Sequence, residues 1–66
     1  FAAWRLVSYM KRGDLVSFKY AEDSDPEYGI IMAILPGYRE PLLEIYFFNQ
    51  RRTLCYWASA VKVISQ

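Results

Sequence analysis

The chain has 66 residues, with eight Lys and Arg against seven Asp and Glu, and its formal charge is +1. This length fits one small domain and excludes a two-domain enzyme with a cleft, while the near-neutral charge argues against a dedicated polyanion-binding protein. Histidine is absent and there is one cysteine. These counts exclude Cys/His zinc sites, Ser-His-Asp and Cys-His nucleophile systems and an intrachain disulfide.

Hydrophobic residues make up 55% of the chain, which excludes a disordered protein. No apolar run reaches the roughly 20 residues that span a bilayer, so we expect a soluble globular domain without membrane contact. Residues 1–9 (FAAWRLVSY) differ in character from the rest, and we separate them as an N-terminal extension of uncertain origin from a domain over residues 10–66. One hypothesis makes Met10 the initiator; the alternative is a short native element in which Trp4 and Val7 share a helix face.

The first half of the domain predicts two strands. Gly13-Asp14 is a turn pair, and residues 15–20 (LVSFKY) alternate with Val16 and Phe18 on the core side. Residues 21–27 (AEDSDPE) form a polar loop. Residues 28–35 (YGIIMAIL) are apolar almost throughout, as in a strand covered on both faces, and Gly29 indicates a bulge or a bend.

The second half predicts three further strands. Residues 36–41 (PGYREP) form a loop in which Pro-Gly is typical of a type II turn. A strand follows over residues 42–48, and 49–52 (NQRR) is a tight hairpin to a strand over 53–57. Residues 58–60 suit one 3₁₀ turn, and 61–64 form the last strand.

Five short strands with these connections match the plan of an all-β, five-stranded SH3-like barrel with one 3₁₀ turn before the last strand, which removes its edges by closure. An OB-like barrel is the alternative fold. The opposite strand register stays open wherever both faces of a strand are apolar. The expected core is Val16, Phe18, Ile30, Met32, Ile34, Leu43, Ile45, Phe47, Cys55, Val61 and Val63.

Three segments carry a resemblance to a known family: residues 12–16 (RGDLV), 28–31 (YGII) and 61–64 (VKVI). They resemble small SH3-like barrel proteins, including short uncharacterised ones from tailed phages, and more loosely Tudor and PWWP domains. The resemblance covers most of residues 11–65 and implies a module that binds peptides, other subunits or nucleic acid. A phage origin would place the protein in the host cytoplasm.

Acidic and aromatic residues make the first candidate site. Four carboxylates lie within residues 22–27, but they lack the EF-hand order, so we expect no metal or other cofactor there. Aromatic residues at strand ends could join this loop in an open surface for a basic or Pro-rich peptide; the alternative is tyrosines that only rim a core. The predicted partner-binding residues are Asp23, Asp25, Tyr28, Tyr38 and Trp57.

Basic pairs make the second candidate site. Lys11 with Arg12 and Arg51 with Arg52 could contact phosphates, as on single-strand-binding barrels. Aromatic cages in Tudor and PWWP domains draw on segments that correspond to residues 20–28 and 49–53, and NQRR offers no aromatic residue there. This argues against methyl-lysine recognition, and the basic pairs make nucleic-acid binding the alternative function.

The strand over residues 42–48 carries apolar groups on both sides. Leu43, Ile45 and Phe47 suit a core, whereas Leu42, Tyr46 and Phe48 face the other way. Because large exposed apolar patches are uncommon on monomers, either Trp4 in the N-terminal segment, a partner or another copy should cover this second face. We predict a homodimer through Trp4, Leu42, Tyr46 and Phe48.

These features together predict a non-enzymatic interaction module that binds a protein partner or its own copy. No catalytic residue is expected, because no base stands beside Cys55, which is most simply a small buried hydrophobic residue. Its unpaired thiol is compatible with a reducing cytoplasm.

Overall fold

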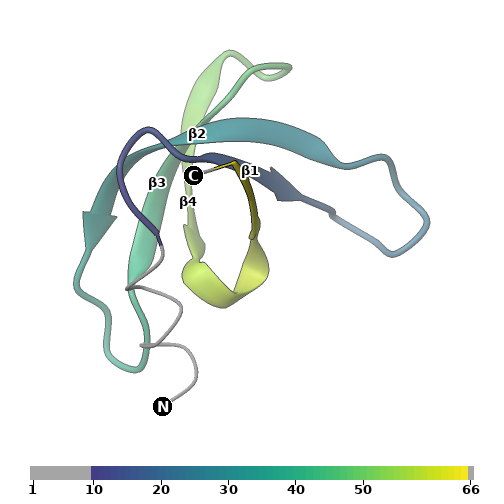
Figure 1. The fold of residues 1–66 in the computed structure, drawn as a ribbon. Coiled ribbons are helices and arrows are strands. Elements are labelled where there is room, and N and C mark those ends of the chain that lie inside the picture. Colours follow the sequence, from purple (N-terminus) through teal and green to yellow (C-terminus); the bar gives the residue numbers. More distant parts are fainter. Residues whose placement is uncertain (1–9, 66) are drawn as a thin grey trace.

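The computed structural model describes residues 10–65 of the chain. The expected all-β class is confirmed: there are five strands and a 3₁₀ turn before the last of them (Figure 1). In chain order the elements are β1 (Leu15–Phe18), β2 (Glu27–Leu35), β3 (Leu42–Phe47), β4 (Arg52–Trp57), the 3₁₀ turn η1 (Ala58–Ala60) and β5 (Lys62–Ser65).

The turn before β1 is anchored to the middle of β2. The Lys11 N–H donates to the Asp14 carboxylate at 3.0 Å, and the Asp14 N–H donates back to the Lys11 carbonyl at 3.1 Å. Gly13 donates to the carbonyl of Ile31, whose own N–H donates to the Asp14 carbonyl. Asp14 is buried although it is charged, because its carboxylate closes this turn.

The sheet is antiparallel throughout, with the strand order β4-β3-β2-β1-β5. The expected closure of the barrel does not occur: β4 and β5 form the two margins, and no strand pairing joins them within residues 10–65. The reason is that η1 follows β4 at once and turns the chain toward β1, with which β5 then pairs. In Figure 1 the sheet curls strongly, and η1 bridges between its two margins.

Side chains inside the curl bring β1 and β4 into contact, although two strands lie between them in the sheet. The Phe18 ring stacks on the Tyr56 ring with centroids 4.2 Å apart, and Tyr56 meets Phe47 edge-on at 5.7 Å. Tyr20 lies edge-on to Phe18 at 4.9 Å. Aromatic packing between β1 and β4 therefore stabilises the curled shape of the sheet, whose two margins are not joined by backbone hydrogen bonds.

A bulge decides which residues of β2 point inward. Its pairing with β3 shifts between Ile31 and Ala33, so inward positions are odd before the shift and even after it. Ile31 is buried and Ile34 packs on the core, whereas Met32 is 52% exposed. The expected inward positions of Ile30 and Met32 were therefore wrong.

The sequence predicted a bulge or bend at Gly29, but the register shift begins two residues later, after Ile31, and Gly29 has another reason to be glycine. A Cβ atom there would lie 2.5 Å from the Tyr46 carbonyl oxygen and 2.7 Å from Ile45 Cγ2. Such distances are too short for any side chain, so the close approach of β2 and β3 requires glycine.

The rest of the core follows the alternation predicted for β1 and β3. Val16, Leu43, Ile45 and Phe47 are fully buried, and Phe18, Val61 and Val63 pack against them. Cys55 is exposed, contrary to expectation, because Leu54 and Tyr56 take the inward positions of β4. Three residues of the buried hydrophobic cluster were missed from the sequence: Met10, Ile31 and Ala58.

Candidate functional site

The outer face of β2, β3 and β4 is apolar where a solvated sheet is usually polar. Cross-strand pairing orders its side chains in rows. One row joins Leu35 to Leu42 and Leu42 to Trp57; the next joins Ala33, Glu44 and Cys55; the third joins Ile30, Tyr46 and Thr53. Glu44 is the one charged residue in these three rows, which we call the outer face.

The row that ends at Trp57 carries two exposed apolar side chains. Leu35 is 37% exposed and Trp57 is 48% exposed. Gly37, in the loop that follows β2, lies under the Trp57 ring: a Cβ there would meet Trp57 Cζ3 at 2.8 Å. Gly37 does not have the positive φ of the expected type II turn, so its role is to make room for the indole and for the Glu40 carbonyl.

A hollow of about 300 Å³ adjoins this row and is lined by Tyr38, Arg39, Glu40 and Trp57. The Glu40 carboxylate fixes one wall, because it accepts hydrogen bonds from the Ser59 backbone N–H at 2.6 Å and from the Ser59 hydroxyl at 3.0 Å. Tyr38 is 87% exposed at the mouth. The sequence pointed to Tyr38 and Trp57 but not to Arg39 or Glu40, because the contact with Ser59 spans 19 residues and leaves no local signal.

The predicted partner-binding residues divide into two groups. Tyr38 and Trp57 lie together at the hollow, whereas Asp23, Asp25 and Tyr28 belong to the loop before β2 and to its beginning. Figure 1 shows these two ends of β2 on opposite sides of the molecule. The acidic loop therefore does not join the Trp57 hollow.

The acidic loop closes on itself. The Ala21 N–H donates to the Ser24 hydroxyl at 3.1 Å, and this hydroxyl donates to the Ala21 carbonyl at 2.7 Å. Lys19 Nζ donates to the Glu22 carbonyl. Within residues 10–65, no three carboxylate or thiol groups converge in a way that could hold a metal ion.

Two of the four residues predicted for an oligomer interface, Leu42 and Tyr46, lie on the outer face. Leu42 and Tyr46 are half-buried there, and Phe48, just after β3, is 42% exposed and lies edge-on to Tyr46 at 6.2 Å. Trp4, the fourth of these residues, lies outside the described part of the chain. The apolar second face of β3 is thus real, and nothing within residues 10–65 covers it fully.

The four predicted phosphate-binding residues lie in separate turns. Lys11 and Arg12 are in the turn before β1, and Arg51 and Arg52 are at the β3–β4 hairpin; all four are exposed. Gln50 links the hairpin to a carboxylate. The Gln50 Nε2 donates to the Glu27 carboxylate at 3.0 Å, and the Gln50 Oε1 accepts a hydrogen bond from Arg52 Nε at 3.1 Å. A carboxylate beside the arginine pair weakens its attraction for phosphate.

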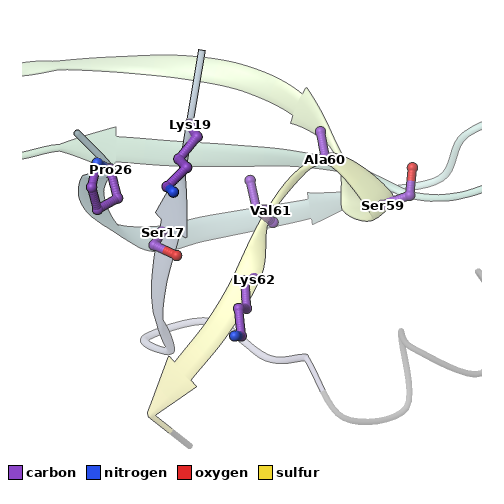
Figure 2. Close-up of a pocket in the computed structure, with 7 residues that line it drawn as sticks. All are labelled: Ser17, Lys19, Pro26, Ser59, Ala60, Val61 and Lys62. Atoms are coloured by element: carbon purple, nitrogen blue, oxygen red, sulfur yellow. The ribbon is translucent and has the colours of Figure 1, made fainter. Parts of the chain in front are cut away.

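A second hollow, of about 490 Å³, lies where β1, the end of the acidic loop and the η1–β5 segment meet (Figure 2). Lys19 and Lys62 supply its charge, and Ser17 and Ser59 supply hydroxyl groups. The sequence did not indicate it, because its residues come from segments more than 30 positions apart.

The surroundings of Tyr56 alter the acidity of its hydroxyl group. Burial raises the pKa of its hydroxyl above the ordinary value of 10.0, and the neighbouring Tyr20 hydroxyl and Glu27 carboxylate add to the rise. Tyr20 also accepts a hydrogen bond from Gln50 Nε2. These groups close the end of the curl beneath the hairpin and keep Tyr56 inside it.

Comparison of the chain with protein-family models, with curated proteins and with solved structures finds no match. The described residues also include no helix of the length and hydrophobicity needed to cross a membrane.

Proposed function

We propose that the protein is a small non-enzymatic interaction module of the SH3-like type, and that the outer face with the Trp57 hollow binds an apolar segment of another protein chain. Five strands with a 3₁₀ turn before the last support the SH3-like assignment. The absence of histidine from the sequence supports a non-enzymatic role.

One observation carries this proposal: a continuous apolar row, Leu35, Leu42 and Trp57, leads across three strands to the mouth of the hollow. Contiguous exposed apolar surface of this kind is typical of protein-binding sites. Tryptophan and tyrosine supply large contact areas at small entropic cost, and Trp57 and Tyr38 frame the hollow. An inserted apolar side chain would lie between these two rings.

The test is a selection of random displayed peptides on the wild-type protein, followed by affinity measurements on three variants. Trp57→Ala and Tyr38→Ala should each weaken the selected peptides at least about tenfold, as expected for aromatic hot spots. Tyr28→Ala is the matched control: this tyrosine is exposed to a similar extent, 46% against 48% for Trp57, at the opposite end of β2. It should leave the affinity unchanged.

Equal binding to wild type and Trp57→Ala would refute the assignment of the hollow. Nucleic-acid binding is the competing function and has a different signature, because phosphate contacts weaken steeply with salt. Retention on heparin at low salt that disappears in Arg51→Ala,Arg52→Ala would favour that alternative over the proposal.

A further inference from the structure

Among the described residues, β4 is a sheet margin without the usual protections of an edge strand. From Thr53 to Trp57 it carries no charge and no proline, and its register with β3 runs without a shift. β5, the other margin, has four residues, begins with Lys62, and faces a register shift in β1. Short length, lysine and irregular register are the usual protections of an edge strand, and β4 lacks all three.

Two hydrogen bonds establish which backbone groups of β4 point outward. Ala58 N–H donates to the Pro41 carbonyl at 3.0 Å, so residues 58, 56 and 54 bond toward β3. The Phe48 N–H donates to the Tyr28 carbonyl, so Phe48 bonds toward β2. The alternate residues of β3 then bond toward β4, which agrees with the first hydrogen bond. Thr53, Cys55 and Trp57 therefore direct their N–H and C=O groups to the open margin, where no strand of residues 10–65 pairs with them.

We infer that a second copy of this chain pairs with this margin, β4 against β4 and antiparallel, with Cys55 opposite Cys55 of the other copy. The inference rests on the proposed function only because it treats the protein as a protein-binding module. The binding surface is the strand margin and not the Trp57 hollow, and the partner is a second copy of the chain.

Symmetry and hydrogen bonding select the register. When two copies extend one antiparallel sheet, the two-fold axis between them is perpendicular to the sheet. The side chains of two opposed residues then lie on the same face of the sheet. The register centred on Cys55 pairs Thr53 with Trp57 and uses all outward groups, about six bonds between the copies. A shift of two residues either way leaves one of the three unpaired and reduces the number to about four.

Charge does not oppose this register. Arg52 precedes the paired segment, and in this register it lies opposite Ala58 of the other copy. In this register no like charges meet along the paired strands.

The test measures the dimer constant by sedimentation and cross-links the protein by mild oxidation. Cys55→Pro removes an outward N–H and no bond to β3, so it should keep the far-ultraviolet spectrum and weaken the dimer at least about tenfold. Cys55→Ser is the matched control and should dimerise as wild type does. Wild type should form a disulfide-linked dimer, because Cα atoms about 5.5 Å apart lie within disulfide range.

The cross-link also tests the register if Cys55→Pro does not fold. The variant Thr53→Cys,Cys55→Ser moves the cysteine two residues along β4. There it would lie opposite Trp57 of the other copy, so the two copies should not form a disulfide. Equal cross-linking at 53 and 55, a monomer at all concentrations, or a folded Cys55→Pro that dimerises normally would each overturn the inference. Peptide binding that Trp57→Ala abolishes in a monomeric wild type would leave the proposed function standing while the inference fails.

Discussion

The bulge in β2 makes opposite predictions for two adjacent apolar residues, Ile31 and Met32. Ile31 is 1% exposed and Met32 is 52% exposed. Ile31→Ala removes three buried carbon groups, which at about 0.8 kcal/mol each is about 2.4 kcal/mol of transfer free energy. The cavity adds to this, so we expect a loss of about 3 to 4 kcal/mol in the free energy of unfolding. Met32→Ala should lose less than about 1 kcal/mol.

The assay is urea unfolding followed by circular dichroism, with all proteins at one low concentration so that association does not contribute. In thermal scans the Ile31→Ala difference corresponds to a melting temperature lower by about 12 to 30 °C. A domain of this size holds only about 3 to 10 kcal/mol in total, so Ile31→Val, expected to cost about 1 kcal/mol, serves if the alanine variant is unfolded. A larger loss for Met32→Ala than for Ile31→Ala would refute the bulge and restore the uninterrupted alternation.

Three further predictions concern single groups. Gly29→Ala should lose about 2 kcal/mol or more in urea unfolding, since its Cβ meets the Tyr46 carbonyl; a neutral result would contradict the close approach of β2 and β3. Tyr56→Phe should flatten the pH dependence of stability: the raised pKa of Tyr56 means that wild type keeps its stability below pH 10.0 and loses it as the pH rises further. An unchanged alkaline slope would be inconsistent with that. Glu40→Ala should lose about 1 kcal/mol through Ser59, against little change in Glu44→Ala, and equal losses would argue against the Glu40 contact.

Strand positions and the 3₁₀ turn could be predicted because their signals are local. Turn residues such as Gly13 and Pro41 bound each strand, and the alternation in LLEIYF puts Leu43 on one face and Glu44 on the other. β1 and β3 therefore came out with the right inward faces. The apolar second face of β3 was visible in the same pattern.

Other features depend on contacts between distant segments. The segment YGIIMAIL is apolar almost throughout, so nothing in it marks the position of the register shift. Met32 was therefore predicted in the core, whereas the structure buries Ile31. TLCYW offered the same ambiguity, and Cys55 fell on the outer side. Closure of a barrel depends on whether the last strand reaches the margin of β4, which no short pattern specifies.

The candidate site could be predicted only in part. Tyr38 and Trp57 stood out as aromatic residues at the ends of predicted elements, and they do share the hollow. Asp23 and Asp25 were grouped with them because all were expected in loops or at strand ends, but the length of β2 separates them. Glu40 was missed because its partner Ser59 is distant in the sequence.

Amide hydrogen exchange across β4, followed by NMR at several protein concentrations, tests the open, self-pairing margin most directly. We predict that the amides of Leu54 and Tyr56 are protected at every concentration, because they bond to β3. The amides of Cys55 and Trp57 should exchange fast in dilute solution and become protected as the copies associate. Protection of Cys55 even at high dilution, or its fast exchange at every concentration, would contradict the account.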